Sequence, residues 1–123
     1  MPYQLRLEDG VMKVVFFDVV TNEDLLRLLN EVSTLEATWD VMPPRLADLR
    51  PIERLEVDFP GIFDVAQARR RHTFPNSFKT AIVATAPVHF GIARMFQTLN
   101  DHPQITVSIF GNVEDALKWL ADA

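Results

Sequence analysis

The side chains able to bind a metal or to attack a substrate are few in this sequence and widely spaced. The histidines are His72, His89 and His102, and they form neither an H-x-x-x-H nor an H-E-x-x-H motif. The chain has no cysteine, which excludes a thiolate zinc site and a cysteine nucleophile. We therefore predict no metal site, because packing or solvent-facing roles explain isolated imidazoles more simply.

Serine nucleophiles and phosphate-binding loops are not indicated either. Ser33, Ser77 and Ser108 lack the G-x-S-x-G pattern that exposes a serine nucleophile. A phosphate-binding loop needs closely spaced glycines, whereas the glycines of this chain are scattered along it. They are Gly10, Gly61, Gly91 and Gly111.

Adjacent carboxylates occur as Glu23-Asp24 and as Glu114-Asp115. Both pairs fall in the first turn of an expected helix, where the helix dipole stabilises negative charge. Acid–base catalysis is therefore the less economical explanation, and no set of nucleophile, base and orienting group can be drawn from the sequence. We predict that the chain is not an enzyme, with no catalytic residue and no bound cofactor.

The segment that begins at Thr85 is the best candidate for a binding site. Residues 78–84 form an apolar run of strand length, and Pro87 suits the first turn of a helix that follows. The carboxyl end of such a strand and the amino end of its helix commonly bind ligands in α/β proteins. The free N–H groups beside Thr85 could hold an anion or could simply start the helix, and the residue types leave both explanations open.

The helix expected over residues 87–99 carries more apolar side chains than one buried face needs. Its expected inward stripe is Val88, Ile92, Met95, Phe96 and Leu99. Phe90 and Ala93 lie off that stripe. Gly91, which costs about 1 kcal/mol relative to alanine inside a helix, indicates a close approach by another group. Core packing, a subunit interface and the wall of an apolar pocket each explain the excess.

Size and charge narrow the classes of partner. The 123 residues suffice for one domain with its own core, and 48% hydrophobic with 24% charged residues is ordinary for a globular protein. The net charge of −5 argues against nucleic acid, because nucleic-acid binders usually carry a basic face. The basic run Arg69-Arg70-Arg71-His72 is best explained as a solvated helix end.

The sequence also lacks the patterns that are typical of targeting signals and membrane spans. No apolar run approaches the ~18 residues that cross a bilayer. The first ten residues lack the basic-then-apolar pattern of a secretory signal. We expect a cytoplasmic protein with a single domain over residues 1–123 and no membrane span.

Hydrophobic patterns predict the strands. They are expected over residues 3–7, 11–20, 45–49, 78–84 and 105–110. Asp9-Gly10 predicts a tight hairpin turn, and the apolar run 11–20 is typical of a strand buried on both faces. Residues 52–59 show no clear period and are expected to be a loop or one helical turn. This order predicts an antiparallel hairpin followed by alternating units in a mostly parallel sheet.

Capping residues and apolar stripes predict the helices. Thr21, Pro60, Pro87 and Asn112 mark their starts. The first helix has its charged residues, Glu36 among them, mostly opposite its apolar stripe. That stripe is Leu25, Leu28, Leu29, Val32 and Leu35. The buried face expected for the second helix is Ile62, Phe63, Val65, Ala66 and Ala68.

The opening LEDGVMKVVFFDVVTNEDL, the strand ADLR and the segment AIVATAPVHFGIARMFQTL together resemble the SpoIIAA-like family, small bacterial proteins of the STAS/SEC14-like group. The most specific matches begin at Ala86-Pro87 and lie there and near the end of the chain. They are Gly91, Arg94, Met95 and Phe96, then Glu114-Asp115-Ala116 and Trp119-Leu120. The resemblance implies an α/β fold of STAS/SpoIIAA-like architecture, a mostly parallel mixed sheet of about five strands with an N-terminal β-hairpin and about four helices.

The resemblance also implies a binding or regulatory domain rather than an enzyme. STAS domains of the anti-sigma-antagonist type are switched by phosphorylation of a serine at the start of the helix after the third strand. The corresponding stretch here runs from Asp48 to Ile52, and residues 39–72 contain neither serine nor threonine. We therefore expect no phosphorylatable serine switch. The SEC14-like side of the resemblance implies an apolar ligand.

These observations predict a regulatory module that acts through protein contacts, as a homodimer or with another protein. The alternative is a carrier or sensor of a small apolar, lipid-like molecule held between the sheet and the helices at residues 59–74 and 87–99. A partner module should have a filled core and an exposed apolar helix face. A carrier should instead have a cavity lined by Phe59, Phe63, Phe90 and Phe96. The residues expected at the ligand or partner surface are Phe59, Phe63, Thr85, Pro87, Phe90, Gly91, Arg94 and Phe96.

Overall fold

The computed structural model describes residues 2–122. Within this range the strands are β1 (Tyr3–Glu8), β2 (Val11–Phe16), β3 (Asp18–Thr21), β4 (Arg45–Asp48), β5 (Ile52–Glu56), β6 (Phe78–Val83) and β7 (Ile105–Phe110). The helices are α1 (Asn22–Glu36), α2 (Phe59–Arg70), α3 (Pro87–Leu99) and α4 (Val113–Ala121).

The main sheet has the strand order β1-β2-β4-β6-β7. Its first pair is antiparallel and its other pairs are parallel, as the sequence predicted. The hairpin turns at Asp9 and Gly10, whose φ angles of 53° and 75° are positive. The small side chain of Asp and the absence of one in Gly make this left-handed turn inexpensive.

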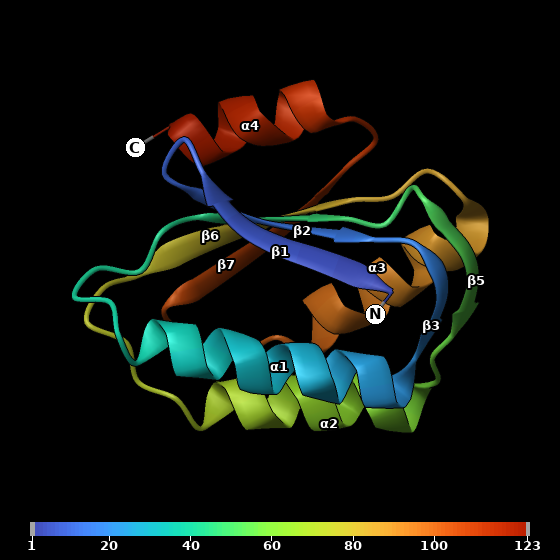
Figure 1. Ribbon diagram of the computed structural model, residues 1–123, viewed down its shortest axis with the longest axis horizontal. Helices are drawn as coiled ribbons and strands as arrows, with labels where there is room; N and C mark the ends of the chain where they lie inside the picture. The colour runs from blue at the N-terminus through green and yellow to red at the C-terminus, as the bar shows by residue number, and fades with distance from the viewer. Residues whose placement is uncertain (1, 123) are drawn as a thin grey trace.

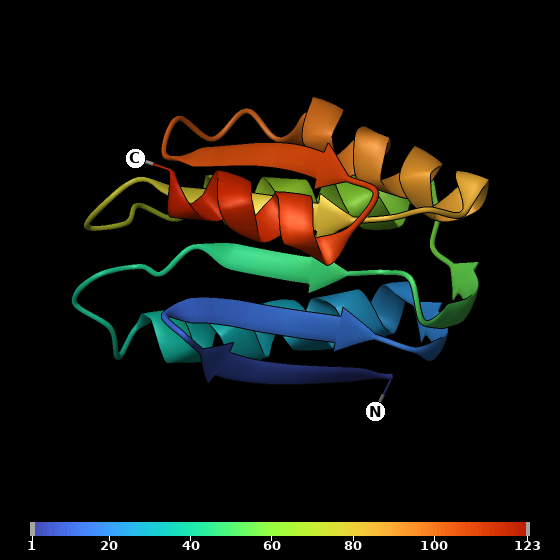
Figure 2. The same cartoon turned by 90° about the horizontal axis from the view of Figure 1, so that it is seen from above.

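Helices cover both faces of the main sheet. Figure 1 shows α1, α2 and α3 below the sheet and α4 alone above it. Seen from above, the parallel strands point the same way, and α1, α2 and α3 begin at the end where those strands finish (Figure 2). We call this the carboxyl end of the sheet. It is the place where α/β proteins most often bind ligands.

The helix starts form as their sequences predict. Thr21 caps α1, with the Asp24 backbone N–H donating to its hydroxyl and the Asp24 carboxylate accepting from the Thr21 N–H. Pro60 lies in the first turn of α2, and Pro87 begins α3. Asn112 caps α4 by accepting from the Asp115 N–H.

The prediction of one long strand over residues 11–20 is wrong. The main-sheet strand ends at Phe16, and Asp18 adopts a positive φ of 55° that turns the chain out of the sheet. β3 then pairs in parallel with β5, over the residues expected to form a loop or helical turn. β3 and β5 form a separate two-stranded side sheet within residues 2–122, and it closes the carboxyl end of the helix-covered face (Figure 1).

Three apolar clusters hold the described layers together. On one face, Ala116 and Leu120 of α4 pack with buried residues of β4 and β6. On the opposite face, a first cluster centres on Phe74, Phe78 and Ile82, and a second on Val14, Phe16 and Val20. Ala47 on the central strand β4 touches both of these clusters. A small residue at that point leaves space between them.

Candidate functional site: an apolar cavity with a buried charge cluster

A cavity of about 200 Å³ lies between the main sheet and the helices α1, α2 and α3. Val14, Ala47 and Ile82 form part of its wall on the sheet side. Leu28 of α1 and Val65 of α2 line it from the helix side. The lining is almost entirely hydrocarbon, so water in this space would find few polar partners.

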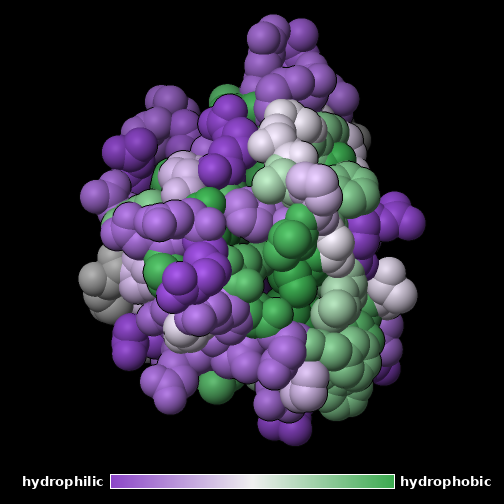
Figure 3. Space-filling model, turned by 90° about the vertical axis from the view of Figure 1, so that its right-hand side faces the viewer, coloured by the Kyte–Doolittle hydropathy of each residue, from purple (hydrophilic) through white to green (hydrophobic). Residues whose placement is uncertain are grey.

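The side sheet forms the wall of the cavity at the carboxyl end. Val20 of β3 and Leu55 of β5 line this part, and Ile92 of α3 lines it from the neighbouring helix. Figure 3 looks onto this end of the molecule and shows a hollow with apolar atoms in its floor, surrounded on one side by polar residues. Access from solvent is therefore expected here, where the first turns of the helices meet the ends of the strands.

A buried charge cluster lies at the opposite end of the helix-covered face. Glu36 in the last turn of α1 accepts from Arg69 Nη1 and Nη2 at 2.7 and 2.8 Å. Its Oε2 also accepts from Arg45 Nη1 at 2.5 Å. The side chains of Glu36, Arg45 and Arg69 are only 5%, 6% and 10% exposed. Arg45 and Arg69 line the cavity, so its polar end is positively charged.

Aromatic rings and backbone hold the two guanidinium groups in place. Arg45 lies over the Phe78 ring at 4.0 Å and donates from Nε to the Pro43 carbonyl at 3.2 Å. Arg69 lies over the Phe74 ring at 5.0 Å. Such stacking stabilises a cation that has lost its water. Arg45 Nη2 is buried and has no hydrogen-bond partner within residues 2–122.

Protonation in this cluster is governed by competition between burial and ion pairing. Burial alone would raise the pKa of Glu36, but hydrogen bonds from Arg69 and the charges of Arg69 and Arg45 outweigh it, and the pKa lies below its ordinary value. Burial lowers the pKa of Arg45, against the opposing effect of Glu36. At neutral pH the cluster therefore holds one carboxylate and two guanidinium groups, a net charge of +1.

The phenylalanines expected in the cavity wall separate into two groups. Phe96 of α3 lines the cavity, as predicted. Phe59, Phe63 and Phe90 do not, because they are 52%, 41% and 45% exposed at the starts of α2 and α3. The rings of Phe59 and Phe63 stack on each other with centroids 6.0 Å apart. The prediction for these three side chains as cavity lining is wrong, since their helix positions face solvent.

The remaining predicted site residues lie on the solvent face of α3 and its entry. Thr85, Pro87, Gly91 and Arg94 are all exposed. A Cβ added at Gly91 would meet no atom within 4 Å, so no other part of the described chain approaches this glycine closely. The buried face of α3 also differs from the inward stripe that the sequence predicted. Val88 of that stripe is 64% exposed, whereas Ala93, which lies off it, is 2% exposed. The buried polar residue of the first turn is His89.

Sequence reasoning missed the charge cluster, although a signal was present. Glu36 was placed on the polar side of α1 and Arg69 at a solvated helix end, and both are buried. Glu36 follows Val32 by four positions and therefore continues the apolar stripe of α1. Arg69 continues in the same way from Ile62 and Ala66 in α2. Charged residues that extend two apolar stripes predict a buried pair. Leu35, which was predicted to belong to the apolar stripe of α1, is by contrast 36% exposed.

Across residues 2–122, no group of three or more His, Cys, Asp or Glu side chains is arranged to hold a metal ion. None of the helices in this range is both long and apolar enough to span a membrane.

Comparison with known proteins supports the fold. No family model matches the sequence, and no curated protein matches it. Among solved structures, the chain is similar to an uncharacterised protein of the DUF3478 family from Shewanella loihica PV-4, described as having a SpoIIAA-like fold. The TM-score is 0.63 at 16% identity, over 97% of this chain and 92% of that chain. This chain has a SpoIIAA-like fold. The architecture implied by the sequence resemblance is therefore confirmed, with β3 and β5 as strands that the resemblance did not indicate.

Proposed function

We propose that this SpoIIAA-like chain is a non-enzymatic binding module that holds a small apolar molecule between its main sheet and α1–α3. The observation that carries this proposal is the cavity of about 200 Å³ with a hydrocarbon lining. An engineered apolar cavity of about 150 Å³ binds benzene, so this space suits a ligand of roughly eight to ten non-hydrogen atoms. The end of the cavity formed by the side sheet lies at the carboxyl end of the parallel strands, where other α/β folds commonly bind ligands.

The side chains around the cavity favour binding over catalysis. Within the described lining, the polar side chains are Arg45, Arg69 and Thr80. The nearby carboxylate of Glu36 accepts hydrogen bonds from both arginines, and its pKa is lowered. A carboxylate held in this way is a poor general base at neutral pH. The arrangement is thus suited to retaining a ligand rather than transforming it.

Binding of 1-octanol tests the proposal directly. We expect isothermal titration calorimetry to show saturable binding of one 1-octanol per chain, because the chain length matches the space. Ala47→Leu adds side-chain volume at the centre of the cavity wall and should weaken binding at least tenfold. Ala121→Leu, an exposed position at the end of α4, is the matched control and should bind as the wild type does. Absence of binding to the wild type, or equal binding to Ala47→Leu, would contradict the proposal.

A second candidate function is self-association through the exposed apolar side chains at the starts of α2 and α3. The stacked pair Phe59 and Phe63 lies at the same end of the molecule as Val88 and Phe90, and all four are substantially exposed. Exposed aromatic side chains close together are typical of protein interfaces. Sedimentation over a range of concentrations should show a dimer that the double variant Phe59→Ser, Phe63→Ser abolishes. A wild-type monomer at high concentration would exclude this candidate.

A further inference from the structure

We propose that the ligand of the cavity carries a single negatively charged head, a carboxylate on a short apolar chain, and that this head is held at the Arg45 end. The inference rests on the proposed function, since it names the chemical class of molecule that the same cavity takes. It follows from the charge of the buried cluster, the convergence of donors on one end of the cavity, and an unsatisfied guanidinium nitrogen.

The charge of the cluster is unbalanced in the described structure. Arg45 and Arg69 share one carboxylate, that of Glu36, which leaves one positive charge in excess. A buried charge without a partner is costly, because the protein interior replaces water poorly. An anionic ligand head would supply the missing charge. A neutral or cationic head would leave the excess positive charge uncompensated or increase it.

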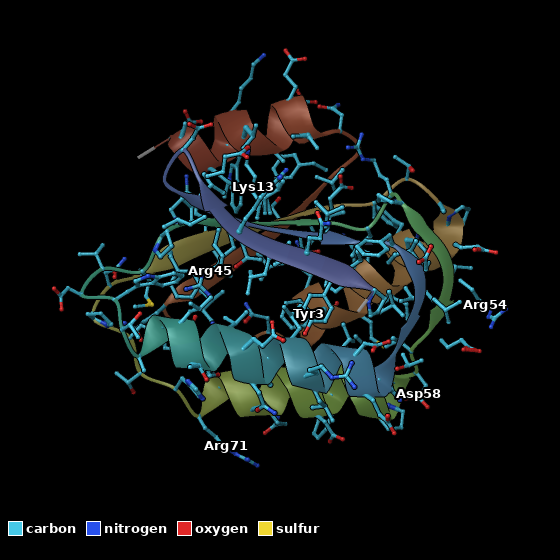
Figure 4. The ribbon with its side chains drawn as sticks, in the orientation of Figure 1. Tyr3, Lys13, Arg45, Arg54, Asp58 and Arg71 are labelled. Carbon is cyan, nitrogen blue, oxygen red and sulfur yellow. The ribbon has the colours of Figure 1, made fainter. Side chains whose placement is uncertain are left out.

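Donors from separate elements converge on this end of the cavity. Arg45 on β4 and Thr80 on β6 are register partners in the parallel sheet, so their side chains lie on the same face of adjacent strands. Both line the cavity, as does Arg69 from α2. Figure 4 shows Arg45 between the main sheet and the C-terminal half of α1, away from the side sheet. Two arginine side chains and one threonine side chain therefore lie at one pole of an otherwise apolar space.

The guanidinium of Arg45 has unused hydrogen-bonding capacity. Its Nε donates to Pro43 and its Nη1 to Glu36, whereas Nη2 has no partner among the described residues. Buried polar atoms in native proteins are nearly always satisfied by protein, water or ligand. A carboxylate is a strong acceptor for guanidinium N–H groups and matches their planar geometry. The apolar chain of such a ligand would extend from this pole toward the side sheet.

Head-group selectivity tests the inference with probes of equal chain length. We expect calorimetric titration of the wild-type protein to give binding of octanoate at least tenfold tighter than that of 1-octanol, and little or no binding of octylamine. Arg45→Gln should remove the preference, so that octanoate binds no more tightly than 1-octanol does. Arg54→Gln, at an exposed position on β5, is the matched control and should keep the preference.

A variant with a smaller effect on folding keeps the test decisive. If Arg45→Gln does not fold, the comparison of the probes with the wild type still decides the charge preference. Thr80→Val retains the shape of the side chain and should reduce the ratio of octanoate affinity to 1-octanol affinity. Equal wild-type affinities for octanoate and 1-octanol would overturn the inference while leaving the proposed function intact. Binding of neither probe would overturn the proposed function and the inference with it.

Discussion

Glu36 in the last turn of α1 accepts hydrogen bonds from both terminal nitrogens of Arg69, a residue 33 positions later in α2. The same carboxylate accepts from Arg45 at the start of β4. One side chain thereby links two helices to the central strand of the main sheet. Because all three side chains are buried, the link is sensitive to the loss of any charge in it.

Replacing Glu36 by glutamine should destabilise the fold strongly. The variant leaves the guanidinium groups of Arg45 and Arg69 buried without a counter-charge, and breaking a buried pair in this way typically costs about 3–5 kcal/mol. We expect urea denaturation to show a loss of that size in the free energy of unfolding. Glu53→Gln, on an exposed position of β5, should change it by less than about 0.5 kcal/mol. Equal stability of the two variants would show that the cluster contributes little.

The lowered pKa of Glu36 predicts a specific dependence of stability on pH. Since the pKa is lower in the folded protein than in the unfolded chain, ionised Glu36 favours folding. This contribution is complete above the ordinary glutamate pKa of about 4.3 and is lost as the pH falls through the folded-state value. The stability difference between the wild type and Glu36→Gln should therefore shrink in urea titrations at progressively lower pH. A difference that stays constant below about pH 4 would contradict this assignment.

Tyr3 should ionise well above the usual range. Burial raises its pKa, and the hydrogen bond that its hydroxyl donates to Glu31 Oε1 at 3.0 Å adds to the effect, giving a value of about 12. The neutral phenol thus favours folding below its ordinary pKa of about 10, and this contribution is lost as the pH rises through the folded value. Tyr3 is the single tyrosine of the chain, so tyrosinate absorbance reports it alone. Glu31→Gln should lower the midpoint, and a native midpoint near 10 would refute the prediction.

The positive φ of Asp18 makes that position selective for residue type. A left-handed backbone costs roughly 1–2 kcal/mol for an ordinary side chain, and a β-branched side chain fits it worst. We expect Asp18→Val to lower the free energy of unfolding by about 1–2 kcal/mol and Asp18→Gly to be neutral or stabilising. Thermal or urea unfolding of both variants checks this order. The reverse order would show that the bend between β2 and β3 does not depend on this backbone conformation.

Gly61 and Asn22 are expected to couple at the starts of α2 and α1. A Cβ on Gly61 would overlap the Asn22 side chain, which donates to the Asp58 carboxylate at 3.0 Å. Gly61→Ala should therefore be close to neutral, because the Asn22 side chain must move and lose this hydrogen bond, which offsets the gain of about 1 kcal/mol that alanine normally brings to a helix. Gly91→Ala, where the added Cβ meets no atom within 4 Å, is the control and should be stabilising. In an Asn22→Ala background, Gly61→Ala should become stabilising as well, and a double-mutant cycle measures the coupling.

Local chemistry accounts for what the sequence alone determined. The capping box of Thr21 and Asp24, the turn at Gly10 and the helix start at Pro87 depend on groups a few positions apart, and each forms as predicted. The hydrophobic runs likewise predicted the strands of the main sheet and its mixed topology. These features are stabilised by interactions within one short segment of the chain, so short windows of the sequence are enough to predict them.

Tertiary structure decided the features that make up the site. β3 and β5 pair with each other over a separation of more than thirty residues. The apolar pattern of residues 11–20 did not indicate that β3 leaves the main sheet, and the residues of β5 show no clear period. Glu36 and Arg69 are buried because their helices bring opposite charges together, a compensation that each stripe alone does not reveal. Phe59 and Phe63 remain outside because the sheet-facing positions of α2 are taken by Ile62 and Ala66. The sequence by itself determined the helices, the strands of the main sheet and the fold class, whereas packing between distant segments decided the side sheet, which side chains surround the cavity and where its charge lies.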